Sequence, residues 1–181
     1  RGAGMQSGCG AGGSIRIACA QLGGTGQILA DGGTGAAYTP ASGGGGGGGR
    51  IALHYGALSG TPTLRISAAA GVDGRSFSTI REFPAQTLGV AGYGWEAQPG
   101  TIFLADTNLL SSPVYRLTGY VVVSNLTVWN CGDLTVSNTV FGMGEGIDLN
   151  VAGNIQVTGT NAALIGASNG CDVVCSGGLS L

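Results

Sequence analysis

The chain has 181 residues, of which 38 are glycine and 9% are charged, and its formal net charge at pH 7 is −2. Glycine comes in bursts such as 43–49 instead of at every third position, which excludes a collagen triple helix. Hydrophobic residues make up 43% of the chain, enough for a packed core and more than a disordered chain carries. The charge is too weak and too evenly spread for us to expect nucleic acid or an anionic membrane surface as a partner.

No apolar run approaches the roughly 18 residues that cross a bilayer, so no membrane insertion is expected within this segment. All seven basic residues are arginine, and the absence of lysine excludes a lysine Schiff base or a lysine–asparagine crosslink. The chain opens without Met and without the apolar stretch of a secretory signal, and it ends in mid-pattern. We therefore expect an internal piece of a longer, processed protein.

Apolar residues alternate with other residues through the first half of the chain, which is the period of half-buried strands. Residues 13–17, 49–53 and 100–104 share the form glycine, polar, isoleucine, any, aliphatic, and each follows a glycine-rich stretch. The first two copies match further at an offset of 36 residues, at Leu22 with Leu58, Gly24 with Gly60, and Ile28 with Leu64. This pattern predicts a repeating unit of strand, turn, strand and glycine-rich excursion.

From Tyr120 the loops shorten, and 125–130 is echoed by 133–138 and by further short apolar segments up to 172–175. Leu126 and Ile147 are 21 residues apart, as are Leu134 and Ile155, which is close to one coil of a parallel β-solenoid. The sequence therefore predicts an all-β parallel solenoid with projecting glycine-rich loops. Residues 1–119 would form a long-loop block, and 120–181 regular coils continuous with it. The alternative is an antiparallel β-sandwich or jelly roll, although the first hundred residues lack its two-residue hairpin signals.

The glycine run 43–49 has two interpretations. Without side chains, such a run can pack as extended, polyproline-II-like strands against each other or against a neighbouring molecule. The alternative is a loop without fixed structure. The absence of serine, asparagine and charge within the run favours ordered packing.

Five cysteines, an odd number, indicate a disulfide in an oxidising compartment with one thiol left over. The candidates for disulfides are Cys9, Cys19, Cys171 and Cys175, and Cys131 is the candidate for an intermolecular or out-of-segment bond. A single histidine and the lack of a second close cysteine pair argue against zinc. No metal and no cofactor are expected.

Three motifs of the N-terminal half resemble one known class of sequence. They are 12–17 (Gly-Gly-Ser-Ile-Arg-Ile), 26–35 (Gly-Gln-Ile-Leu-Ala-Asp-Gly-Gly-Thr-Gly), and the poly-glycine run followed by 50–55. They look like the glycine-rich β-solenoid repeats of very large secreted or surface-attached bacterial proteins. The resemblance covers most of the chain and contains no catalytic signature. It implies an extracellular, right-handed β-helical stalk or an adhesin-like surface protein.

Few residues suggest chemistry. His54 is the only candidate for a physiological acid or base, and the alternation places it on the face opposite the apolar residues. Glu145 and Asp148 are the closest carboxylates, in a glycine-rich turn that they would stabilise. A polysaccharide lyase would have only Arg65 or Arg116 as its base. Aromatic side chains that could stack on sugar rings are Tyr93, Trp95 and Trp129, although core packing suits them better.

The sequence thus predicts a non-catalytic, extracellular structural or adhesive segment that self-associates into a fibre or stalk. The alternative is a β-helical carbohydrate-binding or polysaccharide-degrading module, with surface glycans as its partners.

Overall fold

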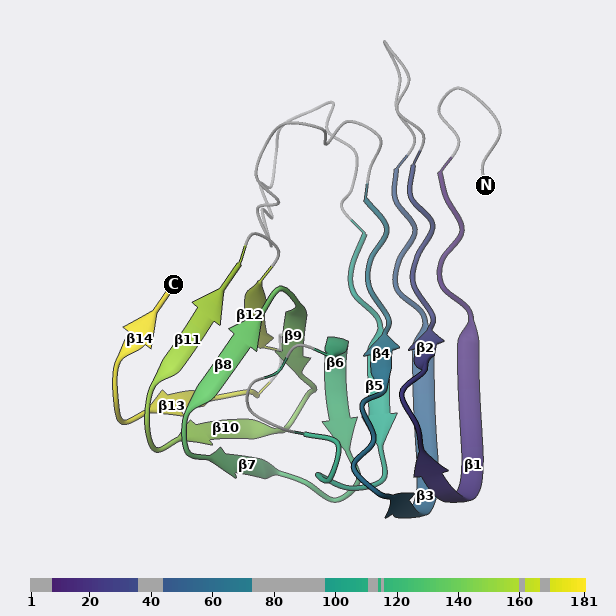
Figure 1. Cartoon of the computed structure of the whole chain (residues 1–181). Coiled ribbons are helices and arrows are strands. Elements are labelled where there is room, and N and C mark those ends of the chain that lie inside the picture. Colours follow the sequence, from purple (N-terminus) through teal and green to yellow (C-terminus); the bar gives the residue numbers. More distant parts are fainter. Residues whose placement is uncertain are drawn as a thin grey trace.

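A computed structural model describes residues 8–35, 44–72, 97–110, 114, 116–159, 162–166 and 170–181. In these ranges the chain is all-β and contains no helix, and the first and last strands, β1 and β14, lie at opposite ends of the stacked strands (Figure 1). The strands are β1 (Ser14–Gly23), β2 (Gln27–Leu29), β3 (Arg50–Ser59), β4 (Arg65–Ser67), β5 (Thr101–Leu104), β6 (Leu117–Val123), β7 (Val128–Cys131), β8 (Leu134–Ser137), β9 (Val140–Met143), β10 (Asp148–Val151), β11 (Ile155–Thr158), β12 (Ala163–Gly166), β13 (Val173–Cys175) and β14 (Leu179–Ser180).

Every ladder between these strands is parallel, which is incompatible with an antiparallel sandwich over the described part of the chain. The largest sheet runs in the order β1-β3-β5-β6-β4-β2, with β9 and β12 continuing from β6. Two three-stranded sheets, β7-β10-β13 and β8-β11-β14, form the rest.

The three related strands predicted from the sequence lie side by side. Ile15 of β1 is opposite Ile51 of β3, which is opposite Ile102 of β5. Burial alternates along these strands as the sequence predicts. Ile51 and Ile102 are 1% and 0% exposed, whereas the residues that follow them are only partly buried. Because Ile51 lies between two other strands, its side chain is covered on both sides.

The offset of 36 residues holds only for the first strand of each repeat. It places Leu22 opposite Leu58, and Gly24 and Gly60 both have positive φ at the following corner. Beyond that corner Ile28 pairs with Ile66, so the predicted match of Ile28 with Leu64 is wrong. The second corner is two residues longer than the first, and the extra length moves the partner from position 64 to position 66.

Strand β6 pairs first with β4 and then with β5, and the change of partner falls at Gly119. Its first residues pair with β4, and the part from Tyr120 onward pairs with β5. Gly119 has a φ of 135°, a conformation that residues with side chains rarely adopt. The boundary placed at residues 119 and 120 in the sequence falls inside this strand.

The C-terminal strands stack with repeats of similar length. Leu134 lies opposite Ile155, which confirms the predicted spacing of 21 residues at this ladder. In the neighbouring sheet Trp129 lies opposite Leu149, which is a spacing of 20 residues. Leu126 and Ile147 lie in the corners before β7 and β10, outside this ladder, so the 21-residue spacing noted for them stays a prediction.

Candidate functional site

The glycine-rich stretches run beyond the strands of the N-terminal half and lie side by side (Figure 1). We call 8–13, 44–49 and 97–100 the entry segments, because they lead into β1, β3 and β5. We call 30–35 and 68–72 the exit segments, because they follow β2 and β4. Together they form the glycine bundle, whose hydrogen bonds run between segments.

The central entry segment, 44–49, is bonded to all four of the others. It accepts hydrogen bonds from the first entry segment, at Gly44 O from Cys9 N (3.0 Å) and at Gly47 O from Gly12 N (2.8 Å). It donates from Gly48 N to Gln98 O of the third entry segment at 2.9 Å.

The two exit segments complete the surroundings of segment 44–49. Gly46 N donates to Gly33 O at 2.8 Å, and Gly49 N donates to Ala30 O at 2.7 Å. Gly71 N of the second exit segment donates to Gly46 O at 2.8 Å. The pattern repeats every three residues, which is the period of a polyproline II helix. The backbone therefore satisfies its polar groups between segments, with no sheet pleat and no internal hydrogen bonds.

The same three-residue period determines which positions of segment 44–49 must be glycine. A Cβ atom on Gly45, Gly46, Gly48 or Gly49 would lie closer than 3.0 Å to backbone atoms of a neighbouring segment. At Gly47 the nearest atom would be Gln98 O at 3.7 Å, an ordinary contact. Two of every three positions in the central segment thus exclude any side chain. The predicted ordered packing of the poly-glycine run is confirmed for 44–49, and Gly43 lies outside the described residues.

Two carboxylates connect successive repeats next to the bundle. Asp31 follows β2, and its Oδ1 accepts hydrogen bonds from Ser67 Oγ at 2.5 Å and from Ala69 N at 2.8 Å. Ser67 is fully buried, so this carboxylate satisfies a hydroxyl that has no access to water. Asp31 thus fixes the start of one exit segment against the start of the next.

Tyr55 and Asp106 form a similar link between β3 and the turn after β5. The Tyr55 hydroxyl donates to Asp106 Oδ1 at 2.5 Å, and Asn108 N donates to the same oxygen at 2.8 Å. Burial raises the pKa of the Tyr55 phenol, and the hydrogen bond to Asp106 and its negative charge raise it further. Both links are structural, since each carboxylate is occupied by donors of its own fold.

The C-terminal end of the stack leaves its core side chains uncovered. Along one ladder the exposed fraction is 0% at Leu134, 3% at Ile155 and 65% at Leu179. A second ladder ends in the same way, since Leu149 is fully buried and its neighbour Val173 is 44% exposed. The inner face of the last strands therefore presents apolar surface that one more layer would bury.

Polar side chains bond from each C-terminal repeat to the next. Asp133 Oδ1 accepts from Asn154 N at 2.7 Å, and Asn154 Oδ1 accepts from Gly178 N at 2.9 Å. Asp148 Oδ1 accepts from Asp172 N at 3.1 Å, a bond to the next repeat and not one within the turn that Asp148 was predicted to stabilise. The other acid predicted for this turn, Glu145, is exposed.

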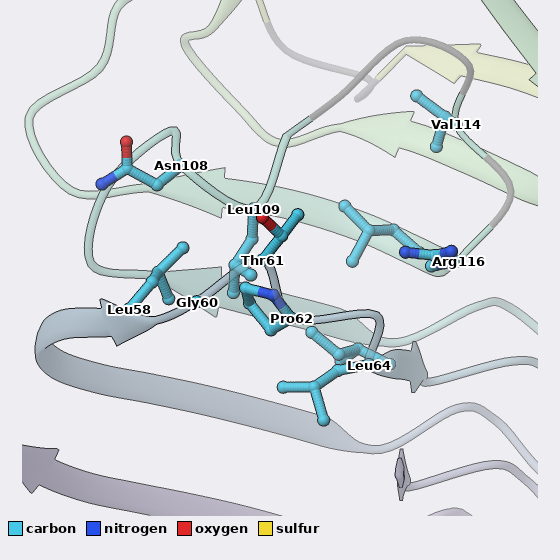
Figure 2. Close-up of a pocket in the computed structure, with 11 residues that line it drawn as sticks. Leu58, Gly60, Thr61, Pro62, Leu64, Asn108, Leu109, Val114 and Arg116 are labelled. Carbon is cyan, nitrogen blue, oxygen red and sulfur yellow. The ribbon is translucent and has the colours of Figure 1, made fainter. Parts of the chain in front are cut away.

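A hollow of about 440 Å³ lies between the corner after β3 and the residues before β6 (Figure 2). Leu58, Pro62, Leu64 and Leu109 form the apolar part of its walls, and Arg116 lies at its edge. The described residues that line it include no carboxylate and no histidine. Arg116, one of the two arginines considered as a lyase base, is among the lining residues, and the other, Arg65, is exposed on β4.

All five cysteines are half-buried. Cys9 and Cys19 lie on one continuous extended stretch, so about 30 Å separates them, far beyond disulfide distance. Cys131 and Cys175 are both opposite Val151, one strand on either side of it. Burial, and then the charge of Asp133, raise the pKa of the Cys131 thiol. Cys171 packs near Gly166, and a disulfide among these residues stays a prediction.

Of the three aromatic residues proposed for sugar stacking, Trp129 is the one that lies among the described residues. Trp129 is 8% exposed and meets the Phe141 ring edge-on at 5.9 Å, so it belongs to the core. Tyr93 and Trp95 lie outside the described residues. His54 is on the outward face, as expected, where its ring lies 5.1 Å from that of Phe103. Sequence analysis did not single out Phe103, although its outward position follows from the alternation in 100–104.

No cluster of three or more histidine, cysteine or acidic side chains that could hold a metal ion occurs among the described residues. The same part of the chain contains no helix that is long and apolar enough to cross a membrane. No family model, curated protein or solved structure matches the chain significantly.

Proposed function

We propose that this chain is a non-catalytic structural or adhesive segment of an extracellular surface protein, built as a parallel β-solenoid whose repeats stack into a stalk or fibre. The observation that carries the proposal is the ladder from Leu134 to Leu179, where core burial falls from complete to one third at the last strand. In stacked-repeat proteins each repeat covers its neighbour, and an end without a polar cap associates with further repeats.

Three features support a role in shape and assembly. The carboxylates of Asp31 and Asp106 are occupied in links between repeats. Chain-wide low charge and glycine richness suit a scaffold whose backbone groups bond between repeats. The extracellular location rests on the resemblance to surface-attached solenoid repeats.

Self-association through the C-terminal end tests the proposal. Leu179→Asp places a charge on the apolar inner face, whereas Thr158→Asp adds the same charge on the exposed outer face of β11 and serves as the control. We expect sedimentation velocity to show concentration-dependent assembly of a second copy onto this end in the wild-type chain and in Thr158→Asp, and its loss in Leu179→Asp. A wild-type chain that stays monomeric at the highest attainable concentration would contradict self-association.

A further inference from the structure

The glycine bundle is closed on one side and open on the other, and this asymmetry starts from the register of the entry segments. Ser14, Arg50 and Thr101 are aligned, so Gly13, Gly49 and Gly100 occupy equivalent positions. A Cβ on Gly100 would collide with Gly49 O, and one on Gly49 would collide with Gly13 O. Each of these glycines is required because the backbone of the preceding entry segment passes beside it.

At Gly13 that reason disappears. A Cβ there would meet nothing within 4 Å, and the same holds for Gly10, whose equivalent Gly46 faces Gly10 O. Neither Gly10 nor Gly13 has the positive φ that favours glycine. Glycine at these two positions costs conformational entropy on folding, yet no contact within the described chain requires it.

The polar groups of segment 8–13 lack the partners that their equivalents have. Gly46 N and Gly49 N donate to an exit segment, whereas Gly10 N and Gly13 N have no partner among the described residues. Likewise Gly44 O accepts from the preceding entry segment, whereas the equivalent Gly8 O has no described donor. The first entry segment thus repeats the bonding surface of the second with its neighbours missing.

On the opposite side of the bundle, at segment 97–100, the series of hydrogen bonds between entry segments ends. In the second repeat, Gly48 N provides the hydrogen bond to the third entry segment. The equivalent position in the third repeat is Pro99, which has no N–H and is buried. Proline at this place ends the series of forward donors that runs through Gly12 and Gly48, whereas segment 8–13 keeps its bonding groups on the other side of the bundle.

We infer that segment 8–13 is a docking surface for an extended glycine-rich peptide of the same kind as the chain's own exit and entry segments. Gly10 N and Gly13 N donate to the exit part of that peptide, as Gly46 N and Gly49 N do to Gly33 O and Ala30 O inside the bundle. The entry part donates to Gly8 O and to Ala11 O, whose equivalent is Gly47 O. The contact continues an interface that the molecule already repeats, and only a backbone without side chains fits against Gly10 and Gly13.

The inference deepens the proposed structural role by naming the partner at the N-terminal side, and its test is independent of the C-terminal end. The Leu179→Asp chain serves as the background, and the probe is a synthetic peptide with the sequence of residues 26–49. We expect the amide NMR signals of Gly10 and Gly13 to shift saturably as peptide is added, and their hydrogen exchange to slow. The affinity will be weak, because ordering a glycine-rich peptide costs about 1–2 kcal/mol per residue in backbone entropy.

Gly10→Ala separates docking from folding. Its methyl group meets no atom of the described residues within 4 Å, but it occupies the space that the peptide backbone needs. We expect it to weaken peptide binding at least about tenfold. Gly132→Ala is the matched control, since its Cβ is equally unobstructed and lies in the corner between β7 and β8.

Three results would overturn the inference: no shift at the solubility limit of the peptide, equal binding by Gly10→Ala, or the same shifts on concentrating the protein without peptide. The last would assign the surface to a second copy. None of them depends on whether Leu179→Asp affects assembly, so the two proposals fail separately.

Discussion

The glycine bundle predicts that neighbouring glycines in one segment respond in opposite ways to the same substitution. In Gly48→Ala the new Cβ would fall closer than 3.0 Å to Ala68 O and Gly100 N, which are backbone atoms on two different segments. To reach ordinary contact distance, the segments must separate by roughly 1 Å, which takes an N···O distance of 2.9 Å outside hydrogen-bond range.

The hydrogen bonds that Gly48→Ala would break determine how much stability is lost. Gly48 N donates to Gln98 O, and Gly100 N donates to Ala68 O, the two atoms that the new Cβ would meet. Leaving the groups of two such bonds without partners costs about 2–6 kcal/mol in the free energy of unfolding. Gly47→Ala, in contrast, meets its nearest atom at 3.7 Å and restricts the unfolded chain, so it should stabilise by about 0.4–1 kcal/mol.

Equilibrium denaturation in urea, followed by circular dichroism, measures both variants against the wild type. The expected midpoints lie below the wild type for Gly48→Ala and at or above it for Gly47→Ala. If the two variants shift the midpoint in the same direction by similar amounts, the three-residue period of the bundle is refuted.

Three further predictions concern the links between repeats and the core. Ser67→Ala removes the buried hydroxyl that donates to Asp31, and we expect denaturation to show a loss of about 1–2 kcal/mol. Tyr55→Phe should cost about 1.5–3 kcal/mol. Because the folded pKa of Tyr55 is raised, its contribution is complete below about pH 10 and declines above it, so wild-type stability should fall there more steeply than that of Tyr55→Phe in pH-dependent unfolding. Leu134→Ala should cost about 2–5 kcal/mol and Leu179→Ala under about 1 kcal/mol; comparable losses would contradict the exposure gradient along their ladder.

Much of the strand pattern could be predicted because it depends on local alternation. The period of two at 13–17, 49–53 and 100–104 requires only that one face be buried, and the three strands are neighbours in register. His54 was placed on the outward face for the same reason. Register beyond a corner could not be predicted, because two extra residues before Ile66 leave the alternation intact while they change its partner.

The sequence alone determined that the chain is all-β and that its glycines fall into blocks that precede related strands. Only the tertiary structure decided which of those glycines are required, because the space for a side chain is limited by other segments. Gly48 is constrained by atoms of Ala68 and Gly100, which are distant in the sequence. It also separated Gly47, which could carry a side chain, from its neighbours, which could not. A run of identical residues has no internal pattern to reveal this difference, and the three-residue period appears only when five segments pack together.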